Sequence, residues 1–190
     1  MTAAVDVVRA GLNESADLHR RVAADRADVV VQAAQTLLEA LSAGRQVLVF
    51  GNGGSATDAQ HFAAELVGRF ERERRAVGVI ALTTDAAILT AISNDYGYDA
   101  VFARQVEALG HEGDVALGIS TSGASKNVNV ALVQAKARGL VTIGLTGKDG
   151  GETGRLVDVH VNVPGRTTAR TQEVHRTLLH VICQLIEPGL

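Results

Sequence analysis

The chain has 190 residues, 46% hydrophobic and 21% charged, an ordinary mixture for a globular protein with a sizeable core. Its formal net charge of -3 argues against a surface that binds nucleic acid. Its one cysteine, Cys183, excludes an intramolecular disulfide and a cysteine-based zinc site, and the apolar residues around it predict an inert core thiol. No basic flank precedes an apolar run at the N-terminus, and no stretch is suited to cross a membrane, so we expect a cytoplasmic protein without a membrane partner.

Residues 1–43 have the pattern of a helical arm. Apolar side chains recur at Val5, Val8 and Leu12 and again between residues 30 and 41, and Gly44 is a plausible stop. A break in the pattern at residues 24–28 suggests two helices. Because such an arm cannot bury its apolar stripe alone, we expect it to pack on the rest of the chain or in a helical bundle between subunits.

From residue 44 onward, strand and helix patterns alternate. Strands are predicted at residues 47–50, 77–82, 115–119, 141–145 and 157–163. Helices are predicted at residues 56–69, 85–93, 99–109, 125–138 and 168–186, and the polar run 69–75 reads as a solvated connection. This alternation predicts an α/β fold, a doubly wound parallel five-stranded sheet flanked by helices, in a single domain over residues 1–190 with the arm at 1–43 and the core at 44–190. Such sheets bind ligands at the carboxyl ends of their strands.

A glycine-rich turn follows the first predicted strand. Gly51-Asn52-Gly53-Gly54-Ser55 separates that strand from a helix, and its glycines let the backbone come close to a ligand. The start of a helix offers N–H groups and a positive dipole end, which suit a phosphate. The turn also fits the dinucleotide pattern G-x-G-x-x-A, but the acid expected about twenty residues later is missing from the end of the next predicted strand. A nicotinamide-dependent oxidoreductase is therefore a distant alternative.

A serine-rich loop follows the third predicted strand. Ser120, Thr121, Ser122 and Ser125 place four hydroxyl groups around Gly123, at the sheet edge that would also hold the glycine turn. An ordinary serine turn with Ser125 as helix N-cap is the alternative. We favour a phosphate site, because the loop offers several O–H and N–H donors beside a second anion-binding turn.

Four side chains with nitrogen or oxygen donors lie on two predicted helices. His61 and Glu65 are four residues apart on one helix face, and Gln172 and His180 are eight apart on the last helix. Two imidazoles, a carboxylate and an amide oxygen suit a divalent cation such as zinc if the fold brings them together. His175, on the same last helix, is expected to be a solvated residue without a role.

The motifs of the chain resemble the phosphoheptose isomerase family, the sedoheptulose 7-phosphate isomerases among the sugar-isomerase (SIS) domain proteins. The resemblance covers nearly the whole chain in motif order and spacing. The matching motifs are Gly51-Asn52-Gly53-Gly54-Ser55, His61-Phe62-Ala63-Ala64-Glu65-Leu66, Asn94-Asp95-Tyr96-Gly97, Ser120-Thr121-Ser122-Gly123, Leu145-Thr146-Gly147-Lys148-Asp149-Gly150-Gly151, and Gln172-Glu173 through His180.

The resemblance implies a homotetramer with active sites at subunit interfaces, and an isomerase that interconverts sedoheptulose 7-phosphate and a manno-heptose 7-phosphate, with one zinc ion per subunit. It assigns the substrate, mostly its phosphate, to Asn52, Gly53, Gly54, Ser55, Ser120, Thr121, Ser122 and Ser125. Arg69, Asn94 and Asp95 would contact sugar hydroxyls or shape the site, with Gln172 also beside the substrate. The metal and proton-transfer group would be His61, Glu65, Gln172 and His180.

Transfer of a proton between adjacent carbons through an enediol needs a base at carbon and an acid–base group or Lewis acid at oxygen. Glu65 is the expected carbon base, and His180 suits ring opening and the oxygen protons. Some family members carry an acid where this chain has Ala169. A non-enzymatic branch that binds a replication-initiator protein lacks the matched glutamate and last histidine, so Glu65 and His180 favour the enzyme over a regulator.

Overall fold

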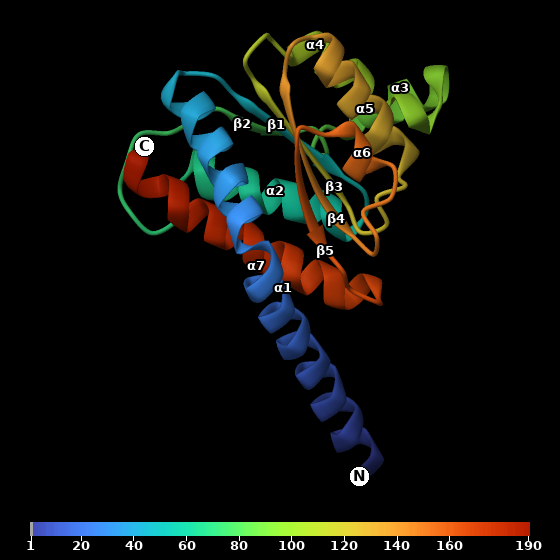
Figure 1. Ribbon diagram of the computed structural model, residues 1–190. Helices are drawn as coiled ribbons and strands as arrows, with labels where there is room; N and C mark the ends of the chain where they lie inside the picture. Colours follow the sequence, from blue (N-terminus) through green and yellow to red (C-terminus); the bar gives the residue numbers. More distant parts are fainter. Residues whose placement is uncertain (1) are drawn as a thin grey trace.

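Five parallel strands form a sheet at the centre of the computed structural model, which describes residues 2–190 (Figure 1). The strands are β1 (Val47–Gly51), β2 (Val79–Ala81), β3 (Val115–Ser120), β4 (Val141–Gly147) and β5 (Val159–Val163). Their spatial order is β2-β1-β3-β4-β5, and every neighbouring pair is parallel. Gly51 pairs with Ile119, and Ser120 with Thr146, so the strand ends align along one sheet edge. The predicted doubly wound parallel sheet is confirmed.

Helices cover both faces of this sheet. One face carries α1 (Thr2–Ser42), α2 (Gly54–Val67) and α7 (Thr168–Ile186), and the other carries α4 (Ala103–Leu109), α5 (Lys126–Ala137) and the short α6 (Thr153–Leu156). The helix α3 (Ala86–Tyr96) lies at the periphery of the second side, and no residue of it is buried (Figure 1). Two 3-10 turns, η1 (Tyr98–Ala100) and η2 (Glu187–Gly189), complete the set.

Side chains of β1 alternate between two apolar cores. Val47 and Val49 pack with α1, α2 and α7, while Leu48 and Phe50 pack with α4 and α5. This alternation follows from the two-residue period of a strand covered on both faces. Cys183 lies fully buried in the first core, where burial raises the pKa of its thiol to about 12. The prediction of an inert core thiol is confirmed.

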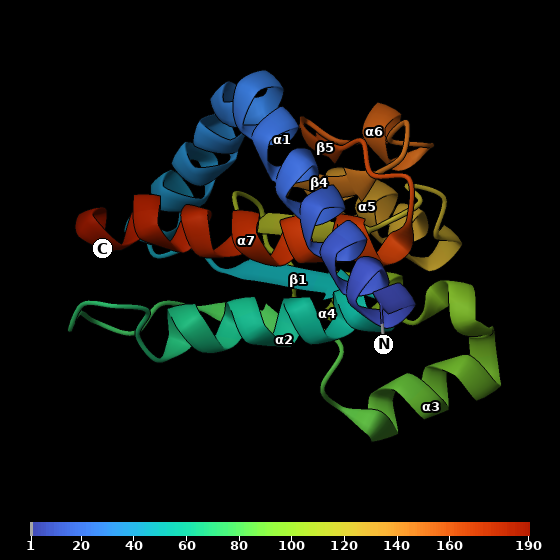
Figure 2. The ribbon, with the colours of Figure 1, turned by 90° about the horizontal axis from the view of Figure 1, so that it is seen from below.

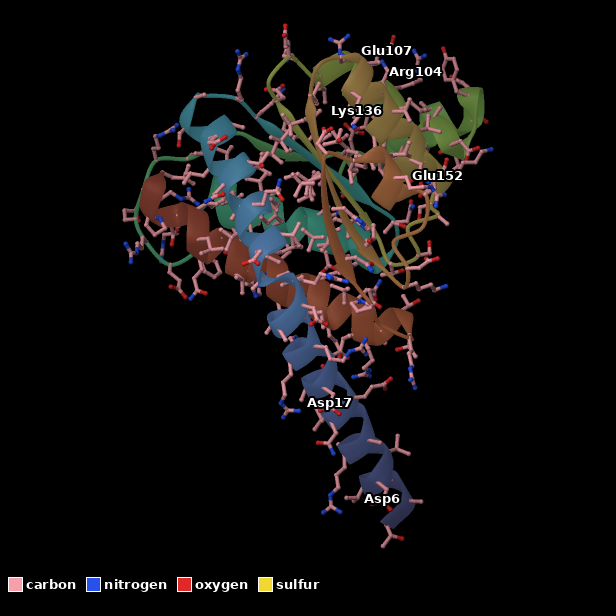
Figure 3. The ribbon with its side chains drawn as sticks, viewed as in Figure 1. Asp6, Asp17, Arg104, Glu107, Lys136 and Glu152 are labelled. Atoms are coloured by element: carbon pink, nitrogen blue, oxygen red, sulfur yellow. The ribbon has the colours of Figure 1, made fainter. Side chains whose placement is uncertain are left out.

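The arm predicted as two helices is one continuous helix, α1, so that prediction is wrong. Residues 24–28 contain neither proline nor glycine, and helical hydrogen bonding therefore continues through them. Figure 2 shows that α1 nevertheless changes direction part-way along its length. Its second half packs on α7 and the sheet, and Gly11, Leu18 and His19 of its first half still contact this side of the molecule. Only the first turns of α1, which carry Asp6, extend away from it (Figure 3).

Several element boundaries also differ from the sequence-based expectation. The edge strand β2 spans three residues, since only Val79–Ala81 pair with β1, and β5 begins at Val159. The helix expected over residues 99–109 divides into η1 and α4. The four-residue α6 was not predicted, because it is too short to show a helical period. None of the helices in residues 2–190 is both long and apolar enough to cross a membrane.

The connection after α2, expected to be solvated, is anchored by a buried carboxylate. Glu187 accepts hydrogen bonds from the backbone N–H groups of Phe70, Glu71 and Arg72 at 3.0–3.2 Å. Arg74 donates to the carbonyl oxygens of Glu65 and Leu66 at 2.8 Å, which fixes the end of α2. Burial alone would raise the pKa of Glu187, but the N–H groups of Glu71, Arg72 and Phe70 stabilise the carboxylate, and its pKa lies below the usual value.

We expect Glu187→Gln to destabilise the protein at neutral pH by about 1–3 kcal/mol, because backbone donors lose a charged acceptor. A group with a depressed folded-state pKa contributes stability above its unfolded pKa, and that contribution is lost as pH falls through the folded pKa. Urea unfolding at a series of pH values measures this. The difference in free energy of unfolding between wild type and Glu187→Gln should have its full size at pH 7. It should become smaller in acid, below pH ~4. A difference that stays constant down to acid pH would contradict a stabilising role of the charge.

Candidate active site

The site lies where the sheet reverses its direction of winding. From β1 the chain moves outward to β2 and then returns to β3 on the other side of β1, so the connections after β1 and β3 depart in opposite directions. In doubly wound sheets this point leaves a crevice at the carboxyl ends of the two strands. The glycine turn at 51–55 and the serine loop at 120–125 lie there side by side, as predicted.

The glycine turn is closely packed against its neighbours. A side chain at Gly51 would place its Cβ 2.7 Å from the carbonyl oxygen of Ile119 and 2.8 Å from Cβ of Ser55. Gly53 adopts a left-handed φ of 56°, which favours glycine. The helix α2 starts at Gly54, two residues earlier than predicted, so its positive dipole end faces the turn directly. These features make the turn a suitable place for an anion.

Hydroxyl groups in the serine loop bond to one another. Ser120 Oγ lies 2.9 Å from Ser125 Oγ and 3.5 Å from Ser122 Oγ, and it accepts the N–H of Gly123 at 3.1 Å. Ser125 occupies the N-cap position of α5, but its side chain makes no capping hydrogen bond. The hydroxyl groups therefore converge within the loop, which is the arrangement that a phosphate site requires and an ordinary N-cap does not.

A third loop, residues 147–151 after β4, supports the serine loop from behind. A Cβ on Gly123 would collide with the backbone of Gly150, and one on Gly147 would collide with the backbone of Thr121. The Thr153 hydroxyl and N–H both donate to the Gly123 carbonyl, at 3.0 and 2.9 Å. The sequence showed this glycine-rich segment but assigned it no role, because the contact depends on the order of the strands.

Two histidines and a glutamate meet where α2 and α7 run side by side. His61 Nε2 lies 2.7 Å from His180 Nε2 and 3.2 Å from Glu65 Oε1, and all three side chains are half-buried. The rings of His61 and His180 meet edge to face, with Phe70 against His180. One imidazole must donate and the other accept for the nitrogens to approach in this way. The structure thus brings together three members of the predicted metal and proton-transfer group.

Gln172 lies at a different level of the same helix pair. Its amide covers Gly54, where a Cβ would collide with it, and it lines a cavity of about 530 Å³ with Thr57, Asp58 and Arg176. His180 follows eight residues later, about 12 Å further along α7. Within one chain, Gln172 therefore adjoins the glycine turn and not the histidine pair.

The remaining predicted residues lie on exposed segments. Asn94 Nδ2 donates to Asp95 Oδ1 at 2.8 Å, and both residues are exposed on α3. Arg69 is exposed after α2, with its Nε 3.9 Å from Glu73 Oε2. Ala169 is exposed in the first turn of α7. In residues 2–190 no hydrogen bond or ion pair joins these side chains to the glycine turn or the serine loop of the same chain.

His175 is not the solvated residue that was expected. Its side chain is fully buried, and its Nε2 lies 2.8 Å from the carbonyl oxygen of Thr146, at the end of β4. Burial lowers its pKa to about 4, so the ring is neutral and Nε2 carries the proton that it donates. His175 therefore attaches α7 to the sheet edge that carries the site. Sequence periodicity placed it on the helix but not on the buried face.

Known proteins match this chain over nearly its full length. The SIS domain family matches residues 12–147. The phosphoheptose isomerase of Geobacter sulfurreducens is 52% identical over 186 residues, which cover 98% of each chain. That of Geobacter metallireducens is 60% identical over 154 residues, covering 81% of this chain and 82% of the relative. The solved structure of the enzyme from Neisseria gonorrhoeae is 45% identical with a TM-score of 0.92, covering 96% of this chain and 98% of that one.

The chain belongs to the phosphoheptose isomerase family. The fold and family expected from the motifs are confirmed, and the chain is an isomerase enzyme of the SIS-domain class. This membership argues against the nicotinamide-dependent alternative, which the glycine turn alone had left open.

Proposed function

We propose that this enzyme, a sugar-phosphate isomerase of heptose biosynthesis, converts sedoheptulose 7-phosphate to D-glycero-D-manno-heptose 7-phosphate by proton transfer through an enediol. The observation that carries the proposal is the cluster in which His61 and Glu65, on the helix that begins at the glycine turn, meet His180 of α7. An anion cradle and a group of proton-transfer residues are the two parts that an aldose–ketose isomerase of a phosphorylated sugar requires.

In this proposal the phosphate binds between the two loops. Hydroxyl and N–H groups of the serine loop meet its oxygens, and the positive end of α2 stabilises its charge. Gln172 of α7, which lies against Gly54 at the start of α2, adjoins the bound sugar. Arg69, Asn94 and Asp95 contact the sugar hydroxyls or shape the pocket. The phosphate-binding and substrate-binding residues are Asn52, Gly53, Gly54, Ser55, Ser120, Thr121, Ser122 and Ser125.

Glu65 is the proposed base at carbon. Its carboxylate is half-buried, lies 3.2 Å from His61 Nε2 and is held at the anchored end of α2. It would remove the proton from the carbon beside the carbonyl group and return it to the neighbouring carbon. His180 would move the proton between the two oxygens, because a neutral imidazole has one donor and one acceptor nitrogen. Phe70 packs against its ring, with the ring centroids 5.8 Å apart, and supports its orientation for this role.

The histidine–glutamate cluster also fits a divalent metal. His61, Glu65 and His180 each offer one ligand atom, and these atoms lie within 4.8 Å of one another. Two imidazole nitrogens and a carboxylate oxygen are a donor set that zinc prefers. We propose one zinc ion per subunit, with Gln172 as a further ligand only if the helices or a second subunit bring it closer. A bound ion would act as a Lewis acid on the sugar oxygens.

We expect protein purified without chelator to contain close to one zinc per chain, and His61→Ala to contain little. The substitution removes the central ligand atom, which faces both His180 and Glu65. Elemental analysis measures the metal content, with His111→Ala as control because that imidazole is 71% exposed and outside the cluster. Equal zinc in His61→Ala and His111→Ala would refute the site.

We further propose a cytoplasmic homotetramer with active sites at subunit interfaces. The first half of α1 exposes apolar side chains, with Val8 60% and Leu12 67% accessible, and α3 buries none of its own residues. Both segments therefore have surface that a second copy would cover. Light scattering at micromolar concentration should give four times the chain mass of 19.8 kDa. A stable monomer would contradict the proposal.

A turnover assay with sedoheptulose 7-phosphate tests the function directly. Formation of the aldoheptose phosphate is expected, and its absence in metal-loaded protein would leave the alternative of a non-catalytic SIS regulator bound to a replication-initiator-type partner. The presence of Glu65 and His180 in one cluster favours the enzyme, because a purely partner-binding protein has no need of this arrangement.

A further inference from the structure

A pair of asparagine side chains joins the glycine turn to the helix that follows the serine loop. Asn52 Nδ2 donates to Asn127 Oδ1 at 2.8 Å, and Asn127 Nδ2 donates to Asn52 Oδ1 at 2.9 Å. Asn127 lies in the first turn of α5 and is only 3% exposed. The turn after β1 and the start of α5, which belong to the two halves of the anion cradle, are therefore held by a reciprocal amide contact.

The orientation of both amides is fixed by a neighbouring backbone group. Asn127 Oδ1 also accepts the N–H of Val128 at 2.9 Å, and a backbone N–H can only donate. The oxygen of Asn127 must therefore face Val128, so its NH2 group must face Asn52. This in turn requires that Asn52 present its oxygen to the NH2 group of Asn127.

A third donor fills the remaining acceptor position of Asn52. The Tyr98 hydroxyl, from η1, donates to Asn52 Oδ1 at 3.0 Å. An amide oxygen has two lone pairs, and the NH2 group of Asn127 and the Tyr98 hydroxyl occupy both. The second hydrogen of Asn52 Nδ2 has no acceptor in residues 2–190 and belongs to a half-buried residue of the turn. Asn52 can therefore donate to a ligand but cannot accept from one.

We propose that Asn127 and Tyr98 are positioning residues that hold Asn52 as a hydrogen-bond donor toward the acceptor oxygens of the sugar phosphate. This inference rests on the proposed function for the identity of the substrate. A fixed donor stabilises phosphate and carbonyl oxygens without reorganisation when the ligand arrives. Neither residue touches the substrate, and both act through Asn52.

Replacing Asn127 by leucine removes the amide contact at similar volume. Asn127→Leu is expected to raise KM for sedoheptulose 7-phosphate by about tenfold, with kcat within about twofold, because the lost donor binds ground state and transition state alike. The rise in Tm on adding inorganic phosphate should shrink in the same variant. Tyr98→Phe should raise KM by a smaller factor, about threefold, since one neutral hydrogen bond is lost and Asn127 still holds Asn52.

The matched control is Asp114→Asn. Asp114 is also 3% exposed and accepts hydrogen bonds from Gln46 and His111, but it lies before β3 at the opposite edge of the sheet. This variant should lower Tm and leave both KM and the phosphate-induced shift unchanged. If Asn127→Leu fails to fold, Tyr98→Phe decides, because its ring is 57% exposed and its loss of a hydroxyl does not disturb the core.

Two results would overturn the inference. The first is that Asn127→Leu and Tyr98→Phe have the same KM, and the same rise in Tm with phosphate, as Asp114→Asn. The second is that phosphate does not raise the Tm of the wild type. A different result separates the inference from the proposed function. If the wild type binds phosphate but does not turn over the heptulose phosphate, and Asn127→Leu loses the phosphate shift, the positioning role stands and the substrate assignment fails.

Discussion

Glu65→Gln is expected to lower kcat by about 10²–10⁴-fold, the contribution of a positioned general base, with KM changed little. Glutamine keeps the shape of the side chain but cannot accept the proton from carbon. The substitution leaves intact the Arg74 contact to the Glu65 carbonyl, which is a backbone interaction, so the end of α2 should remain in place. Steady-state kinetics with sedoheptulose 7-phosphate measure the effect, and turnover near the wild-type rate would show that Glu65 is not the base.

Substitution of His180, the second proposed proton-transfer residue, gives a stricter test. His180→Gln should also lose kcat, and the double variant should lose less than the product of the two single losses, since both side chains serve one transition state. His111→Gln is the matched control, because that imidazole is 71% exposed and lies outside the cluster. In deuterated water the wild type should incorporate deuterium at the carbon that receives the proton, and Glu65→Gln should not.

The second large effect is expected at the phosphate. Ser120→Ala combined with Ser122→Ala should raise KM by about 10²-fold or more, because two hydrogen bonds to a charged ligand are worth roughly 1.5–3 kcal/mol each. The loss should exceed that of either single variant, since the two hydroxyls are 3.5 Å apart and converge on the same space.

A control for this experiment is Ser15→Ala with Ser42→Ala, two serines of α1 that lie away from the serine loop. Inorganic phosphate should compete with the substrate in the wild type and lose its effect in the loop variant. An unchanged KM in the loop variant would place the phosphate elsewhere, without affecting the assignment of Glu65.

The fold could be predicted from sequence because its signals are local. Short apolar strands alternating with helical periods specify a parallel sheet, and each of the five strands lies where its pattern indicated. The errors occur where tertiary contacts set a boundary. The strand β2 is short because only three of its residues meet β1, and α1 continues through a weak pattern because nothing interrupts its backbone.

The site could be predicted in part for the same reason. Two phosphate-type loops after strands of one parallel sheet must share an edge, and a four-residue spacing must place His61 beside Glu65. The burial of His175 and the amide pair of Asn52 and Asn127 depend on which helix faces pack together, and a periodicity argument does not resolve this. Gln172 shows most clearly what the sequence could not predict. It is eight residues from His180, which puts both on one face of α7 but leaves them two turns apart.

The helices α2 and α7 pack in parallel and contact each other turn by turn. Gly54 lies opposite Gln172, Asp58 bonds Arg176 with its Oδ1 2.8 Å from Nε, and His61 meets His180, so successive turns are paired. A single inserted residue between Asp58 and His61 would turn the imidazole by about 100° and advance it by 1.5 Å, and the pairing beyond that point would be lost. Lineages of this enzyme should therefore vary the length of their surface loops while keeping the residue count from 54 to 65 constant. The number of residues along α2 thus sets the distance between the phosphate-binding turn and the proton-transfer cluster.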